Sequence, residues 1–142
     1  MFRFALFAFN AFLFSFTPIY AQSGASTFLV ELNKVTEKNG ACEIVLFAHN
    51  DMGKNISDIS LKLAVVDAAG QFNSMLSLPL GAMRDTDSKF ASYTLQMSCA
   101  ELSKVVVNDV ANCSLENVDG SSNLCNDQLE VNSRELEIEM AL

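Results

Sequence analysis

The chain has no tryptophan, a single histidine and only 9 lysine and arginine residues against 17 aspartates and glutamates. Without tryptophan, the aromatic surface that a sugar-binding cleft commonly uses is hard to find, which disfavours a glycosidase. The formal net charge of −8 repels phosphate backbones and anionic lipid. We therefore expect no nucleic-acid partner and no attraction to a membrane surface.

The scarcity of histidine also narrows the enzymatic alternatives. A copper or zinc enzyme on a β-sandwich normally needs several imidazoles, and here His49 is alone. A Ser-His-Asp or Cys-His site would have to use this residue, yet no G-x-S-x-G segment presents a serine nucleophile. We interpret His49 as a strand-end residue beside Asn50 and Asp51. The sequence thus predicts no enzyme, no cofactor and no metal.

Carboxylate pairs are the remaining enzymatic alternative, because two acids can divide the acid and base roles. Asp85 and Asp87 stand in a polar turn, and Glu135, Glu137 and Glu139 share one face of an expected strand. Both patterns are typical of solvated surface. We therefore assign no catalytic residue.

The chain also lacks an apolar run long enough for an ordinary membrane-spanning helix of about 20 residues. Its longest apolar stretch, residues 4–16, follows the single charge of Arg3, and small residues come after it. This layout is typical of a secretory signal peptide that is cleaved after Ala21. We expect residues 1–21 to be removed, leaving residues 22–142 as one periplasmic or secreted domain without a stable membrane anchor. An uncleaved anchor is the alternative.

Four cysteines are present, Cys42, Cys99, Cys113 and Cys125. An even number behind a signal peptide predicts two disulfides in an oxidising compartment. Zinc sites usually contain closer pairs than these. Of the three pairings, we favour Cys42 with Cys99 and Cys113 with Cys125, since strand-like segments flank the latter two and a hairpin brings its ends together.

Apolar and polar residues alternate with a period of two through most of the chain. The alternation predicts strands over residues 28–33, 42–49, 59–66, 89–97 and 129–140. Residues 72–78 are expected to form the hairpin partner of the third strand, and the β-branched residues within 105–111 predict a buried strand. Turn residues separate these segments, and the SCAE sequence at 98–101 predicts a single capped helical turn. Seven or eight short strands predict an all-β fold, an antiparallel immunoglobulin-like β-sandwich.

The segment NCSLENVDGSSNLCND, residues 112–127, has the polar residues of a turn between two cysteines. Aligned to an EF-hand loop on Gly120, it places Leu115 and Asn126 where calcium needs carboxylates. A looser cation site from Asp119, Asn123 and Asp127 is the alternative. We expect a clasped hairpin whose tip is a partner-binding loop, formed by Glu116, Asn117, Asp119, Gly120 and Asn123.

Several short stretches carry a family resemblance. They are VLFAHN at 45–50, an NxxGK turn at 50–54, ISLKLAVVD at 59–67, LPLG at 78–81 and VVVND at 105–109. Together with the late cysteines, they resemble FxLYD-type immunoglobulin-like modules of bacterial envelope proteins, and the chain is similar to a small exported family of alphaproteobacteria. The aromatic residue of the FxLYD signature is missing from residues 63–67. The resemblance implies a noncatalytic exported module and carries over no catalytic residue.

We therefore expect a noncatalytic exported binding or accessory module whose partner, another exported or envelope protein, docks on a sheet edge or on the loop ends. One alternative is a self-assembling structural subunit that donates residues 135–140 as a strand, although the glutamates there favour a protected edge. The other alternative is a secreted protease inhibitor that presents residues 114–124.

Overall fold

The computed structural model describes residues 26–120 and 122–142, so the expected signal peptide at residues 1–21 lies outside the described residues. The strands are β1 Thr27–Lys38, β2 Ala41–Asp51, β3 Ile56–Asp67, β4 Phe72–Pro79, β5 Ser88–Leu95, β6 Leu102–Leu115, β7 Leu129–Ser133 and β8 Glu139–Ala141. A 3-10 turn, η1 Cys99–Glu101, precedes β6, and a short helix, α1 Ser122–Asp127, precedes β7. No helix in this part of the chain is long and apolar enough to cross a membrane.

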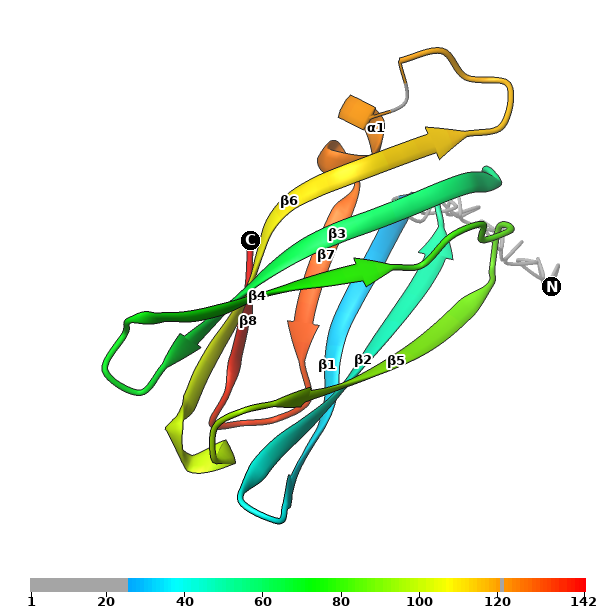
Figure 1. Cartoon of the computed structure of the whole chain (residues 1–142). Coiled ribbons are helices and arrows are strands. Elements are labelled where there is room, and N and C mark those ends of the chain that lie inside the picture. Colours follow the sequence, from blue (N-terminus) through cyan, green and yellow to red (C-terminus); the bar gives the residue numbers. More distant parts are fainter. Residues whose placement is uncertain (1–25, 121) are drawn as a thin grey trace, which may run out of the picture.

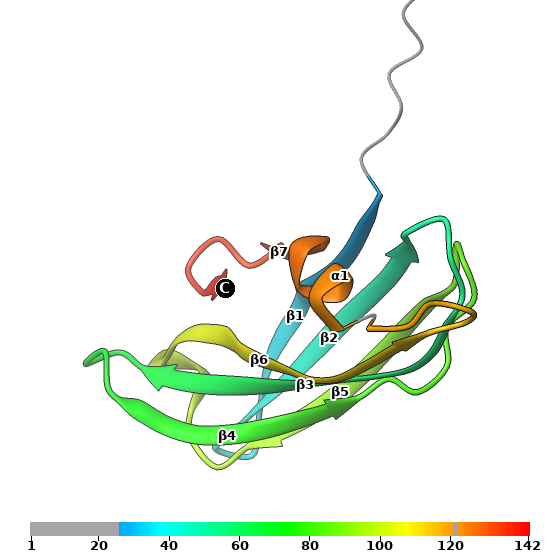
Figure 2. The same cartoon turned by 90° about the horizontal axis from the view of Figure 1, so that it is seen from above.

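The strands form two four-stranded sheets that pack face to face, as Figures 1 and 2 show. Sheet A has the order β5-β2-β1-β7, and sheet B has the order β4-β3-β6-β8. The predicted β-sandwich is therefore confirmed. Two edge pairings depart from the antiparallel expectation, because β7 runs parallel to β1 and β8 runs parallel to β6. Parallel partners need a crossover connection, which local alternation in the sequence does not reveal.

The core lies between the sheets and follows the predicted alternation. On β2, Cys42, Ile44, Leu46 and Ala48 point inward and are buried, and their neighbours point outward. On β3 the inward residues are Ile59, Leu61, Leu63 and Val65, each fully buried. Burying a large aliphatic side chain contributes about 1.5–3 kcal/mol, so these two central strands supply much of the stability of the sandwich.

Both favoured disulfides are present. Cys42–Cys99 ties β2 to η1, and Cys113–Cys125 joins β6 to α1. The reason given for the second pairing was wrong, however, because Cys125 lies in α1 and the segment is not a hairpin. The short helix α1 instead brings Cys125 close to Cys113.

The capped turn at residues 98–101 is confirmed, since the Ser98 backbone N–H donates to Glu101 Oε2 at 3.0 Å. The continuous strand expected over residues 129–140 is wrong. The chain turns at residues 134–138, where the Ser133 hydroxyl donates to the Ile138 carbonyl at 2.7 Å. Glu135 and Glu137 therefore do not share a strand face with Glu139.

Candidate functional site

The predicted partner-binding loop lies at the end of the sandwich shown at the top of Figure 1. Its five predicted residues, Glu116, Asn117, Asp119, Gly120 and Asn123, are all exposed. Asn55 anchors the loop, because its carbonyl accepts the Glu116 N–H at 3.0 Å and its amide donates to Glu116 Oε2 at 2.9 Å. Positive φ angles at Asn117 (58°) and Gly120 (69°) turn the chain.

The exposed side chains of this tip offer hydrogen bonds and the two acidic charges of Glu116 and Asp119. Its exposed side chains include no aromatic residue and no arginine, which are the types that dominate binding energy at protein interfaces. Across the described ranges, no three acidic, histidine or cysteine side chains gather as metal ligands. The looser cation site includes the amide of Asn123, which is outside that set of residue types, and it stays an alternative. Display of the loop to a partner stays a prediction.

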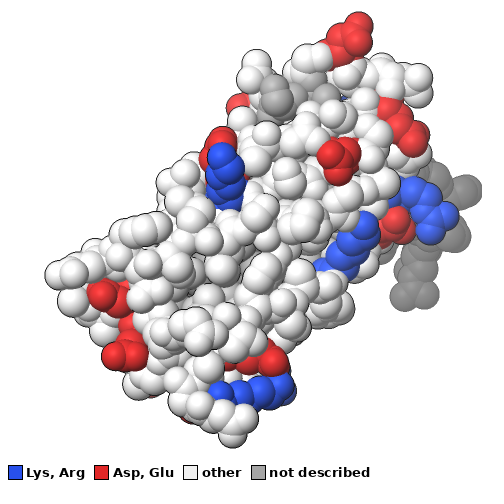
Figure 3. Space-filling model, viewed as in Figure 1, with Lys and Arg blue, Asp and Glu red and all other residues white. Residues whose placement is uncertain are grey.

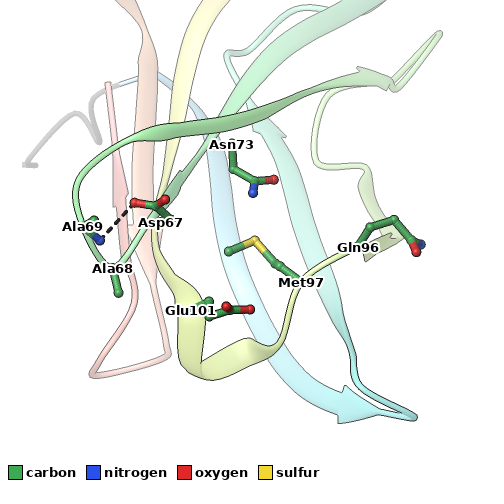
Figure 4. A pocket seen from close by; sticks show the side chains of 7 residues that line it. All are labelled: Asp67, Ala68, Ala69, Asn73, Gln96, Met97 and Glu101. Atoms are coloured by element: carbon green, nitrogen blue, oxygen red, sulfur yellow. Dashed lines mark hydrogen bonds between the residues drawn. The ribbon is translucent and has the colours of Figure 1, made fainter.

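A cavity of about 400 Å³ opens at the opposite end of the sandwich, and Figure 4 shows its side chains. It is lined by Asp67, Ala68, Ala69, Asn73, Gln96, Met97 and Glu101. Both acids are engaged locally: Asp67 Oδ1 accepts the Ala69 N–H at 2.9 Å, and Glu101 Oε2 accepts the Ser98 N–H. These carboxylates stabilise turns, and we assign them no ligand.

The free edge of β5 is a feature that the sequence analysis did not single out. Asn50 N–H donates to the Asp87 carbonyl at 3.0 Å, and the register continues with His49 opposite Ser88 and Phe47 opposite Phe90. Opposed residues in an antiparallel pair alternate between hydrogen-bonded and non-hydrogen-bonded positions. The backbone groups of Phe90, Ser92 and Thr94 consequently point away from β2. We call these outward N–H and C=O groups the β5 edge; within the described part of the chain, β5 pairs with β2 alone.

An aromatic cluster stands beside the β5 edge on the outer face of sheet A. It consists of Phe47, His49 and Phe90, whose positions alternate with the buried residues of β2 and the half-buried residues of β5. The ring centroids of Phe47 and Phe90 are 5.0 Å apart with planes tilted by 50°, and those of Phe47 and His49 are 6.3 Å apart. The Phe90 side chain is 65% exposed. Such a large exposed ring with an aromatic neighbour is suited to contact another protein.

His49 lies near the end of β2, as the sequence predicts, and its Nδ1 is 2.9 Å from Ser88 Oγ. The two side chains face each other across neighbouring strands on the outer face. Acyl transfer by such a pair needs hydrogen-bond donors aimed at the developing oxyanion as well as a base. We therefore interpret this contact as a cross-strand hydrogen bond that orients the His49 ring beside Phe47.

The only charged side chain of β5 is turned away from the outer face. Lys89 Nζ donates to the Ala82 carbonyl at 2.8 Å and also to the Leu80 carbonyl, both in the segment after β4. On the same side of β5, Tyr93 Oη donates to the Ser77 carbonyl at 2.8 Å, and burial raises the pKa of Tyr93. These two side chains fasten β5 to β4 and to the segment that follows it, and they leave the β5 edge without a charge of its own.

A buried carboxylate adjoins the cluster. Glu31 on β1 is opposite Phe47 and only 3% exposed, although it points to the outer face. Arg134 Nε covers it at 2.7 Å from Oε1, and the Asn33 and Asn132 amides also donate to it. Burial acts to raise the pKa of Glu31, but hydrogen bonds from Asn33, Arg134 and Asn132 and the Arg134 charge outweigh it and hold the pKa below its usual value.

The acids of the polar turn and a neighbouring amide act as structural groups. Asp85 Oδ1 accepts the Gly53 N–H, and Asp87 Oδ2 accepts the Arg84 N–H, each at 2.9 Å. The Arg84 backbone N–H is also the main reason why the pKa of Asp87 lies below its usual value. The structural role of Asn50, a fully buried amide at the end of β2, was not predicted from the sequence. The sequence does contain a signal for a buried amide, because Asn50 is the next inward position after Ile44, Leu46 and Ala48 on the same strand.

The comparisons with known proteins assign no function. No family model matches the chain, and no curated protein matches it by sequence. Among solved structures, the fold is similar to that of IrmA from Escherichia coli, with a TM-score of 0.47 and 10% identity. The match covers 75% of this chain and 91% of IrmA. The family resemblance described from the sequence therefore stays a prediction.

Proposed function

We propose that this protein is a noncatalytic exported binding module that takes an extended segment of another exported or envelope protein along the β5 edge. The observation that supports the proposal is the juxtaposition of unpaired backbone groups at Phe90, Ser92 and Thr94 with the exposed Phe90 ring and its neighbour Phe47. Strand addition of this kind draws affinity from main-chain hydrogen bonds and specificity from the alternating side chains.

The other edge of sheet A is less suited to this role. Proteins protect exposed edges by making them short or charged. β7 has five residues and carries Glu130, whereas β5 has eight residues and directs its only charge, Lys89, toward the β4 side. An incoming strand therefore meets a longer and uncharged ladder at β5.

The aromatic cluster supplies an anchor for such a strand. A residue of the incoming segment that pairs with Phe90 places its side chain on the outer face, next to the Phe90 ring. Phe47, on β2, then lies on the other side of that ring. Because aromatic contacts dominate the binding energy of many interfaces, an apolar or aromatic residue at that position is favoured.

Export is the second component of the proposal. All four cysteines form disulfides, which fits an oxidising compartment. Together with the signal-peptide pattern at residues 1–21, this supports a periplasmic or secreted location.

The experiment begins with affinity capture from envelope and secreted fractions, followed by measurement of the Kd for the purified captured protein. Phe90→Ser is the test variant. Phe72→Ser is its matched control, because Phe72 is a phenylalanine of nearly the same exposure, 64% against 65%, on sheet B. A second variant, Ser92→Pro, removes one outward N–H and leaves the β2 ladder intact, since edge strands tolerate proline.

We expect Phe90→Ser and Ser92→Pro each to raise the Kd about tenfold or more, while Phe72→Ser leaves it unchanged at low protein concentration. Equal affinity of the wild type, Phe90→Ser and Ser92→Pro would refute the proposed site. Circular dichroism checks that the variants are folded.

A further inference from the structure

We infer that a second copy of this chain pairs antiparallel with the free edge of β4, with Met75 opposite Met75 of the second copy. The β4 edge belongs to sheet B, whereas the β5 edge belongs to sheet A. The inference therefore goes beyond the proposed function, and each can fail without the other.

The hydrogen-bond pattern shows which groups of β4 are free. Leu80 N–H donates to the Ile59 carbonyl at 2.9 Å, and the register continues with Lys62 opposite Ser77 and Ala64 opposite Met75. Since hydrogen-bonded and non-hydrogen-bonded positions alternate, Met75, Ser77 and Pro79 direct their backbone groups away from β3. In the described residues, β4 has no other strand neighbour.

At two of these three positions, one backbone group is not available to bond to an added strand. The Ser77 carbonyl already accepts the Tyr93 hydroxyl at 2.8 Å, and Pro79 has no N–H to donate. Met75 retains both an outward N–H and an outward C=O. A two-fold axis at Met75 satisfies these groups reciprocally, because each copy donates to and accepts from the same residue of the other. The register also keeps the Tyr93–Ser77 bond and places Pro79 beyond the central pair.

The charge distribution favours a second copy at this edge. The chain carries a net charge of −8, so two copies repel wherever acidic surfaces meet. β4 has no charged side chain, and Figure 3 shows an uncharged band across the middle of the face on which it lies. The β7 and β8 edges, by contrast, carry Glu130 and Glu139.

The exposed apolar side chains of β4 add contact area. Met75 is 47% exposed and Phe72 is 64% exposed. In a symmetric contact the two Met75 side chains lie side by side, and the two B sheets form one continuous sheet. Because Tyr93 on β5 reaches the Ser77 carbonyl on β4, the β5 edges of the two copies lie on the same side of the sandwich as this contact.

The test is sedimentation velocity on protein purified from a periplasmic extract of cells that express the full chain, from about 1 to 500 µM. Met75→Lys places two ammonium groups opposite each other, and Met75→Leu is the matched apolar control. In a second measurement, Met75→Cys supplies the only free thiol, because all native cysteines are bonded. A hydrogen-bonded antiparallel pair has a Cα separation of about 5.5 Å, which a disulfide can bridge.

We expect the wild type and Met75→Leu to dimerise with rising concentration, and Met75→Lys to need at least tenfold more protein. Met75→Cys should form a linked dimer without reductant, while Glu130→Cys on the β7 edge should not. A wild type that stays monomeric over the whole range overturns the inference, as does a dimer that Met75→Lys leaves unchanged. If Met75→Lys does not fold, the contrast between Met75→Cys and Glu130→Cys decides the question.

Discussion

Arg134 Nε lies 2.7 Å from Oε1 of Glu31, a residue 103 positions earlier in the chain. The contact ties the turn after β7 to the centre of sheet A and neutralises a carboxylate that is almost completely covered. It also borders the aromatic cluster, because Glu31 is the β1 neighbour of Phe47. The Glu31–Arg134 pair thus holds in place the part of sheet A that borders the proposed binding surface.

The first prediction concerns pH. Because the folded-state pKa of Glu31 lies below its ordinary value of 4.5, its ionised form stabilises the fold above about that pH. This contribution is lost as the pH falls through the folded-state pKa. Glu31→Gln should lower the free energy of unfolding by about 1–3 kcal/mol at neutral pH and by less in acid. Urea unfolding at several pH values checks this, and an equal loss at every pH would contradict it.

A second prediction concerns Asn50. Its amide donates to the carbonyls of Lys54, Met83 and Arg84 at 2.9–3.2 Å, and its Oδ1 accepts the Met52 N–H. Removal of the side chain breaks these four hydrogen bonds around a buried position, although the Met83 and Arg84 carbonyls keep the Ile56 and Asp87 N–H donors.

Asn50→Ala should therefore lower the free energy of unfolding by about 3 kcal/mol, measured by denaturant titration. Asn126→Ala, at an exposed position in α1, is the control and should have little effect. If Asn50→Ala lowers the free energy of unfolding no more than Asn126→Ala does, the Asn50 amide does not hold residues 52–54 and residues 83–84 together.

The third prediction separates the two disulfides. In the chain-entropy picture, loss of the Cys42–Cys99 link costs about 4 kcal/mol and loss of the Cys113–Cys125 link about 3 kcal/mol, since their sequence separations are 57 and 12. Each double Cys→Ala variant should melt roughly 10–20 °C below the wild type. Calorimetry measures this. An unchanged melting temperature after reduction of the wild type would mean that the cysteines are not structural.

The fourth prediction concerns the loop at residues 116–123. If the partner docks on the β5 edge, replacing Glu116, Asn117, Asp119 and Asn123 together by alanine should leave its Kd unchanged. The same variant tests the alternative of a protease inhibitor, since loss of inhibition in a protease panel would point to the loop. A large rise in the partner's Kd would move the binding site to this end of the sandwich.

Much of the fold follows from local patterning. Period-two alternation located β1 through β6, because strands with one buried face must alternate and turn residues separate them. The strand pattern also guided the disulfide pairing, since it placed Cys42 on an inward row and Cys99 just after the predicted strand over residues 89–97.

The C-terminal third shows what local patterning misses. α1 has six residues, too few for a helical period to be visible. The alternation of residues 129–140 continues through the turn at 134–138, which contains neither glycine nor proline. The parallel pairing of β7 with β1 depends on a crossover and leaves no local signal.

The candidate site likewise depends on tertiary structure that local sequence patterns do not reveal. The sequence placed Phe90 on an alternating strand, but only the sheet order shows that β5 is an edge and that Phe47 is its neighbour. Lys89 is an ordinary surface charge in the sequence. Its inward hydrogen bonds, which leave the edge uncharged, come from tertiary packing.

Site-specific photo-crosslinking in cells shows whether another exported protein docks along the β5 edge. A benzophenone amino acid replaces Phe90 in one variant and Glu130, on the opposite edge of sheet A, in the other. We predict that irradiation links position 90 to another exported protein and leaves position 130 without that adduct. No adduct from position 90, or the same adduct from both positions, would mean that the partner does not dock along the β5 edge.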